Sequence, residues 1–338
     1  MCFLGVWRCP STATSEPLFC NKNYSIKYIE RKLKILPSNT NVAGTHFIKD
    51  FHLSCGKDVP IFEADTMHGL NQLLGKAKFI NKDYGTVYYR GECSLHDSLI
   101  PSILRNKRNV SAAIQQLNTL KNRFLQDSKL CNFIKLSTEK NAKNHQLEGM
   151  LQHYGVKTRY VDVVDNHWIA LWMGNNQCVE YKIQEKYYHY EKREIPIIEC
   201  LQDSVKLDID DLYQYVLLIA MPHSNIHVSG ITEHNDFILI DLRAALPSTF
   251  LRPHAQHGLV MRKVVHTDET IEKYDLATEI VGIIRIRTDR VSRWLGNGSL
   301  LTQENLFPAP GYDTGYDVLL QRTNIFKSSE FKIAKYII

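Results

Sequence analysis

The stretch from Gln152 to Gly174, QHYGVKTRYVDVVDNHWIALWMG, decides how the centre of the chain folds. An apolar repeat at helical spacing precedes it and ends near Gly155, which stands where a left-handed helix cap would fall. Residues 158–163 are rich in β-branched and aromatic side chains, as is typical of a strand. Asn166 then predicts the start of a short helix that Gly174 ends. The stretch therefore predicts a helix, a glycine turn, a strand and a second helix.

A second element lies upstream, where residues 86–92 predict a strand that contains the triplet Tyr-Arg-Gly. Because side chains alternate along a strand, Tyr88 and Arg90 share one face. Gly91 has no side chain, so another backbone or a ligand can approach it closely. Arg90 then either holds an anion or forms a structural ion pair with an acidic residue such as Asp162.

The composition of the 338 residues is that of an ordinary globular chain, with 44% hydrophobic and 23% charged residues and a net charge of +5. Its 8 cysteines are scattered without a CxxC pair, which favours reduced thiols over a disulfide framework or a zinc site. No stretch reaches the roughly 18 apolar residues of a membrane span. We expect a cytoplasmic protein that needs no metal and binds no membrane.

The chain divides unevenly along its length. Residues 1–65 show little periodicity and hold prolines and polar clusters, so we expect an irregular N-terminal extension. The apolar runs at 213–221 and 237–242 predict buried central strands. We expect an α+β fold in which helices flank a mixed, partly antiparallel sheet of about five to seven strands.

These motifs carry a resemblance to a known family. The stretch at 152–171 resembles the central signature of the FRG domain family, in which Gln-His-Tyr-Gly leads into a Thr-Arg-Leu-Leu-Asp strand and an Ala-Leu helix. The Tyr-Arg-Gly triplet is similar to the one that names the family. Residues 251–261 resemble a third family element, Arg-x-x-x-Gln-x-Gly-Leu-Phe. The resemblance implies an FRG domain over 66–325 and a C-terminal tail over 326–338.

The same elements have a weaker resemblance to ADP-ribosyltransferases. Those enzymes place Arg or His at the end of a first core strand, a hydroxyl residue on a second, and Glu, Asp or Gln before a third. Arg90, Thr158 and Gln256 stand at the matching places, which implies an ADP-ribosyltransferase-like arrangement, catalytic roles for these three residues, and NAD as the substrate. Departure of nicotinamide leaves an oxocarbenium-like centre that a carboxylate stabilises better than an amide, so Asp162 is an alternative to Gln256.

Six further residues would bind the substrate in this interpretation. They are Tyr88, Gly91, His153, Tyr154, Arg159 and Asp162. On a regular strand Arg159 and Asp162 point to opposite faces, so they cannot both enter one cleft unless the strand bends.

Three interpretations are open from the sequence, and whether the chain is an enzyme is open with them. The first is an NAD- or nucleotide-using, ADP-ribosyltransferase-like effector of bacterial toxin or anti-phage defence type, with a protein or a nucleic acid as acceptor. The second is a non-catalytic module that recognises a nucleotide, a nucleic acid or a partner protein, favoured by Gln256 and by the basic segment 105–143. The third is a buried hydrogen-bond network with a structural role only.

Overall fold

The computed structural model describes residues 32–107, 109–182, 185–193, 212–224, 226–265, 270–322, 324–326 and 331–337. Within these residues the chain forms a ten-stranded sheet and a three-stranded sheet. The strands of the large sheet, in spatial order, are β1 (Thr45–His52), β2 (Asp58–Ala64), β12 (Ile280–Arg287), β7 (Tyr213–Pro222), β3 (Gly85–Glu92), β4 (Val161–Val164), β11 (Gly258–Lys263), β10 (Phe237–Asp241), β9 (Ile231–Glu233) and β8 (Ile226–Val228). The small sheet is β13 (Lys335–Tyr336), β6 (Lys186–Lys192) and β5 (Asn176–Lys182).

The described helices follow from the apolar repeats of the sequence. They are α1 (Met67–Asn81), α2 (Val110–Gln126), α3 (Ser128–Ile134), α4 (Lys140–His153), α5 (His167–Asn175), α7 (Leu242–Ala245), α8 (Leu251–Ala255), α9 (Thr288–Trp294), α10 (Gln303–Leu306) and α11 (Thr314–Leu320), with the short 3-10 helices η2 (Ile271–Tyr274), η3 (Leu276–Glu279) and η4 (Gly296–Gly298). None of the helices in the described part of the chain combines the length and the apolar character that crossing a membrane requires.

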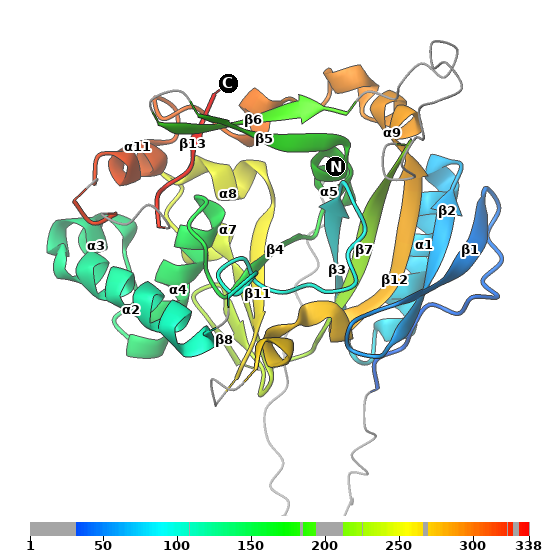
Figure 1. The fold of residues 1–338 in the computed structure, drawn as a ribbon, viewed down its shortest axis with the longest axis horizontal. Coiled ribbons are helices and arrows are strands. Elements are labelled where there is room, and N and C mark those ends of the chain that lie inside the picture. The colour runs from blue at the N-terminus through cyan, green and yellow to red at the C-terminus, as the bar shows by residue number, and fades with distance from the viewer. Residues whose placement is uncertain are drawn as a thin grey trace, which may run out of the picture. The chain divides into compact units, whose positions relative to one another are not determined.

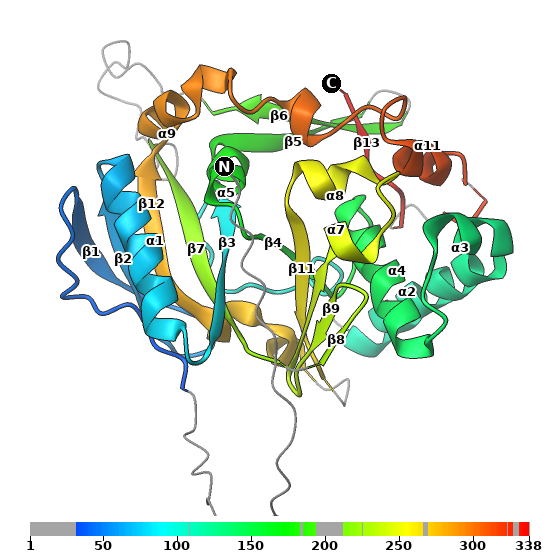
Figure 2. The ribbon, with the colours of Figure 1, turned by 180° about the vertical axis from the view of Figure 1, so that it is seen from behind.

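The helices cover the large sheet in two groups (Figures 1 and 2). Helices α1 and α5 pack on strands of the β12–β7–β3 part of the sheet, while α4 packs on β10 and β11 and α2 packs on α4. A third apolar cluster lies on the opposite face of the sheet, where Leu99, Leu276 and Ala277 cover side chains of β7, β11 and β12. The fold is therefore α+β, as predicted. The sheet is mixed, because β2 runs parallel to β12 whereas the other neighbours in it are antiparallel.

The large sheet is nearly divided between β3 and β4. A single residue pair, Tyr89 with Val164, joins these two strands. On either side the pairing is continuous, because β3 pairs with β7 along its whole length and β4 pairs with β11 along its whole length. We call this junction the seam. Backbone groups beside the single pair are free to meet side chains instead of a neighbouring strand.

The helix–glycine–strand–helix prediction is confirmed, with one shift. Helix α4 ends at His153, Gly155 has a φ of +89°, and the Asn166 side chain accepts a hydrogen bond from the second residue of α5. The strand begins at Val161, later than predicted. The reason is local, because the Tyr160 N–H donates to the Thr158 hydroxyl, which satisfies it outside the sheet.

Residues 45–64, for which we expect irregular structure, instead form the hairpin β1–β2. The hairpin belongs to the sheet because Ile61 and Phe62 of β2 pair with β12, more than two hundred residues away. With the hairpins β1–β2 and β8–β9 included, the sheet has ten strands and not five to seven. Residues 1–31 lie outside the described residues. The boundaries at 66 and 325 stay predictions, although residues 335–336 of the expected tail form β13 of the small sheet.

Candidate functional site

Arg90 lies at the seam and connects the two halves of the large sheet. Arg90 and Glu92 share a face of β3, and Arg90 Nε donates to Glu92 Oε1 over 2.5 Å. Across the seam, Arg90 Nη1 donates to the backbone carbonyl of Asp162 over 2.8 Å. Burial opposes the charged guanidinium, but the charges of Glu92 and Asp162 raise the pKa of Arg90. Arg90 is therefore a paired cation, with Glu92 as its ion-pair partner and 21% of its side chain exposed; that it holds an anion stays a prediction.

Asp162 is held from the other side by the end of α4. Its Oδ2 accepts from Gln152 Nε2 over 2.6 Å, and Gln152 Oε1 in turn accepts from the Thr158 hydroxyl over 2.7 Å. Nδ1 of His153 lies 3.6 Å from Asp162 Oδ1. Burial raises the pKa of Asp162, but His153, Arg90 and Gln152 together lower it below its usual value. The Asp162 carboxylate is therefore charged at neutral pH, and 42% of its side chain is exposed.

These contacts define one connected group, which we call the seam cluster. Its members are Arg90, Glu92, Gln152, His153, Thr158 and Asp162. The cluster includes four of the nine predicted site residues. Thr158 is fully buried, so its hydroxyl reaches the exposed carboxylate only through Gln152.

Gly91 has a packing role in this structure. A Cβ built on Gly91 would lie 1.8 Å from the backbone oxygen of Ala170 in α5. The close approach that glycine permits is therefore made by helix α5, which rests directly on β3.

Arg159 belongs to a different cluster, which is centred on the fully buried Glu148 of α4. Arg159 Nε and Nη2 donate to the two oxygens of Glu148 over 2.9 and 2.6 Å, and Lys121 Nζ donates over 3.0 Å. Burial alone would raise the pKa of Glu148, but Arg159 and Lys121 lower it well below its usual range. Arg159 and Asp162 therefore have different partners and do not share one cleft, in agreement with the expectation.

The remaining predicted residues make other contacts. Tyr154 is fully buried, and its hydroxyl donates to Asp313 Oδ2 over 2.8 Å. Tyr88 is half-buried against the apolar cluster on the opposite face of the sheet, and burial raises its pKa. Gln256 is buried, and its Nε2 donates to the carbonyl of Leu306 over 2.6 Å. The hydrogen bonds found among the described residues do not connect these three side chains to the seam cluster.

Sequence reasoning missed Glu92, Gln152 and Glu148. Glu92 stands two residues after Arg90, so strand alternation alone places both side chains on one face. Gln152 is the first residue of the Gln-His-Tyr-Gly motif, but its uncharged side chain gave no signal of a charged site in the sequence. Glu148 lies between the apolar residues Leu147 and Leu151 of α4, and a carboxylate on a buried helix face signals a buried cationic partner.

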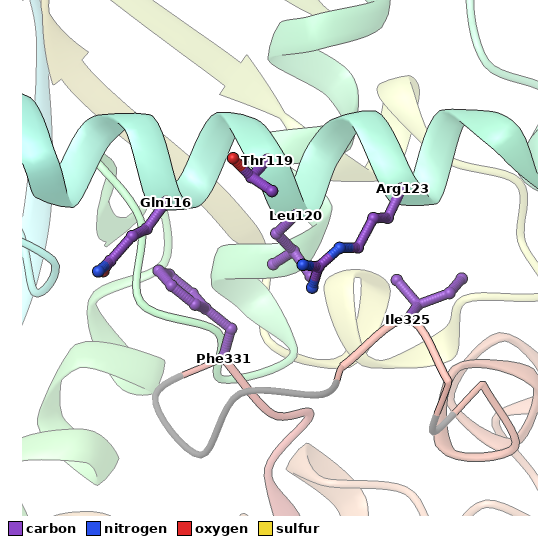
Figure 3. A pocket seen from close by; sticks show the side chains of 6 residues that line it. All are labelled: Gln116, Thr119, Leu120, Arg123, Ile325 and Phe331. Atoms are coloured by element: carbon purple, nitrogen blue, oxygen red, sulfur yellow. The ribbon is translucent and has the colours of Figure 1, made fainter.

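Two cavities lie away from the seam cluster. One of about 260 Å³ separates α2 from the segment that holds Ile325 and Phe331, and Figure 3 shows the Arg123 side chain extending from α2 beside it. The other, of about 640 Å³, lies between the α3–α4 connection and residues 244–249. Neither cavity is lined by a predicted site residue. Within the described residues, no three His, Cys, Asp or Glu side chains are grouped so as to hold a metal ion.

We expect His145 to make the stability of the protein fall as the pH falls. Its Nδ1 lies 3.0 Å from the Tyr160 hydroxyl, and burial, reinforced by the charge of Arg262, lowers the pKa of His145 to about 4. This folded-state pKa lies below the unfolded value of 6.5, so the unfolded chain binds the proton more readily. The contribution of His145 is therefore complete above pH 6.5 and is lost as the pH falls toward 4. When the pH falls from 7 to 5, we expect the titration of His145 to lower the free energy of unfolding by about 2 kcal/mol.

Urea unfolding of the wild type and of His145→Gln at both pH values measures this contribution. The variant should lose about 2 kcal/mol less than the wild type on acidification. His52→Gln is the matched control, because His52 is exposed, and it should follow the wild type. Equal pH dependence in the wild type and His145→Gln would refute the assignment.

Comparison with known proteins identifies one family that matches part of the chain. No curated protein and no solved structure matches the chain. Residues 85–180 match the family model of the FRG domain. This segment runs from the start of β3 into β5 and includes every member of the seam cluster. The chain therefore contains an FRG domain, with the seam cluster inside it.

Proposed function

We propose that the FRG domain binds NAD at the seam cluster and transfers ADP-ribose from it to a protein or a nucleic acid. The observation that carries this proposal is the seam itself, where one residue pair joins the two halves of the sheet and a charged, partly exposed cluster lies beside it. The resemblance to ADP-ribosyltransferases supplies the reaction class. It also suggests an effector of bacterial toxin or anti-phage defence type.

Asp162 would stabilise the reacting centre. In the transfer, the bond between ribose C1′ and nicotinamide breaks, and nicotinamide leaves with the electron pair. The positive charge that develops at C1′ is stabilised by a carboxylate, and an acceptor group then bonds to C1′ and loses its proton. The Asp162 carboxylate is charged and partly exposed, whereas the Gln256 amide is buried and bonded to Leu306. We therefore assign the stabilising role to Asp162 in preference to Gln256.

Arg90 and Thr158 would support this carboxylate in different ways. Arg90 is fixed by its bonds to Glu92 and to the Asp162 carbonyl, and its partly exposed side chain would contact a phosphate or ribose oxygen. Thr158 acts as a positioning residue, because its hydroxyl orients Gln152, which in turn bonds Asp162. Thr158 lies just before β4 and not on the strand, so its proposed role is carried through Gln152.

Nicotinamide release from NAD tests the proposal, measured for the purified full chain with and without an acceptor extract. Asp162→Asn keeps the size of the side chain but removes its charge, so kcat should fall at least about 100-fold with little change in KM. Arg90→Ala should mainly raise KM. Asp165→Asn is the matched control, because Asp165 is similarly exposed and pairs with Arg243, and it should keep full activity. Wild-type turnover by Asp162→Asn would eliminate the proposed role.

A recognition module without catalysis is the alternative, and the Arg90–Glu92 pair favours it. A cation that is already paired is a weaker electrostatic catalyst, yet it can still select a ligand by exchanging partners. This alternative predicts that NAD binds in equilibrium experiments, that Arg90→Ala weakens the binding, and that no nicotinamide is released under any condition. If the ligand is a nucleic acid, its affinity should fall steeply with salt, because phosphate contacts release counterions.

A further inference from the structure

Arg252 of α8 is a buried cation enclosed by aromatic rings. Its side chain is fully buried, and the centre of its guanidinium lies within 4.5–5.3 Å of four ring centroids. The rings belong to Tyr154, Phe307, Tyr316 and Tyr336. Figures 1 and 2 both show α8, α11 and β13 close together at this place.

Within the part of the chain that the structure describes, the guanidinium of Arg252 has aromatic neighbours but no hydrogen-bond acceptor. Its three nitrogens, Nε, Nη1 and Nη2, have no hydrogen-bond partner among the described residues. Asp313, which accepts from the Arg252 backbone N–H, also bonds the Tyr154 hydroxyl and the Tyr316 N–H. Ring faces attract a cation but cannot accept its N–H groups as oxygen does, so a buried guanidinium of this kind is incompletely satisfied.

The Arg252 enclosure adjoins the seam cluster. The rings of Tyr190 and Tyr336 stack with centroids 6.1 Å apart. Burial raises the pKa of both tyrosines, and in each case the charges of Arg252 and Asp162 also act on the hydroxyl. Tyr190 also adds to the raised pKa of Arg90. A ring contact joins the two groups, because His153 of the seam cluster and Tyr154, one of the rings around Arg252, lie edge to face with centroids 6.2 Å apart.

One of the four rings stands on a short element. Tyr336 is half-buried and belongs to β13, which pairs with β6 through only two residues, opposite Tyr187 and Tyr188. The residues before it are anchored, because Ala334 is buried and its N–H donates to the Tyr154 carbonyl over 3.0 Å. A movement that starts after Ala334 would uncover the guanidinium. It would separate the Tyr336 ring from Phe307 and Tyr190 and break the bond from the Ile337 N–H to the Tyr188 carbonyl, but it would leave the Ala334 anchor in place.

We propose that Arg252 binds the diphosphate of the nucleotide, and that Tyr336 on β13 is the gate that covers this subsite. The inference rests on the proposed function and extends it, since Arg252 would hold one end of a nucleotide whose ribose lies at Asp162. A diphosphate supplies the oxygens that the three nitrogens lack, in the forked geometry that arginine matches. The aromatic rings around it offer stacking surfaces for a base.

Pyrophosphate binding to the full chain, measured by calorimetry, tests the subsite without requiring turnover. Tyr336→Ala removes the cover, so we expect it to bind pyrophosphate at least tenfold more tightly than the wild type. Tyr213→Ala is the matched control, because Tyr213 is a half-buried tyrosine of β7 that faces Arg285, and β7 pairs with neither β13 nor β6. This control should leave the affinity unchanged. The double variant that combines Arg252→Gln with Tyr336→Ala should bind pyrophosphate no more tightly than the wild type.

Further outcomes separate this inference from the proposed function. If Arg252→Gln prevents folding, Arg252→Lys takes its place in the double variant. This double variant should lose most of the tighter pyrophosphate binding that Tyr336→Ala gives, because lysine lacks the forked donors of arginine. Arg252-dependent pyrophosphate binding without nicotinamide release supports the subsite even where the transfer reaction fails. A Tyr336→Ala variant that binds pyrophosphate no more tightly than Tyr213→Ala, or equally well without Arg252, overturns the subsite whatever the result for NAD.

Discussion

Replacing Glu148 with glutamine should lower the free energy of unfolding by about 3–5 kcal/mol, the usual cost of breaking a buried ion pair. Glu148 is completely buried and accepts hydrogen bonds from both Arg159 and Lys121. Without the negative charge of Glu148, the cations Arg159 and Lys121 would lie close together with no partner between them, and the Lys121 side chain is only 6% exposed. An uncompensated buried charge is costly because the protein interior solvates it poorly.

Chemical denaturation monitored by circular dichroism measures this loss. Glu139→Gln is the control on the same helix, since Glu139 is exposed at the N-cap of α4 and its side chain makes no capping hydrogen bond. It should change the stability by no more than about 0.5 kcal/mol. Equal stability of the two variants would show that the Glu148 cluster is not a major source of stability. Nicotinamide release should follow the folded fraction, because Glu148 lies outside the seam cluster.

Replacing Gly91 with alanine should be at least as damaging, with a loss of about 3 kcal/mol or more. The new Cβ would fall 1.8 Å from the Ala170 oxygen and 2.8 Å from the Gly174 nitrogen, both of them backbone atoms of α5. Backbone cannot turn away as a flexible side chain can, so α5 and β3 must separate. Because β3 carries Arg90 and Glu92, the seam cluster should be disrupted together with the packing.

Gly75→Ala is the matched control in the same protein. Gly75 lies in α1, and a Cβ there would meet nothing within 4 Å. Alanine should therefore stabilise the helix by up to about 1 kcal/mol. Thermal unfolding of both variants gives the comparison, and a Gly91→Ala protein with an unchanged melting temperature would contradict the contact between α5 and β3.

The local structure around the seam was predictable because it depends on neighbours in the sequence. Gly155 permits the left-handed turn after α4, and Asn166 caps α5 with its own side chain. The place of Arg90 near the end of a strand follows from the run of β-branched and aromatic residues before it. These features need only a few consecutive residues, and they were enough to indicate the FRG domain.

The contacts of the site residues depended on the tertiary structure. Arg90 bonds the carbonyl of Asp162, which lies 72 residues away, and the sequence could not show that a single residue pair would join β3 to β4. Gln256 stood in a motif position that suggested catalysis, but its amide is bonded to Leu306, 50 residues away.

By itself, the sequence determined the helix–glycine–strand–helix unit, the α+β class and the residue types available for chemistry. Only the tertiary structure decided which polar groups would be buried and paired, as Glu148 and Thr158 are, and which would stay partly exposed, as Asp162 does. The physical reason is that propensity and capping act over one or two helical turns. Burial and ion pairing, in contrast, depend on surfaces that meet only when distant segments have packed together.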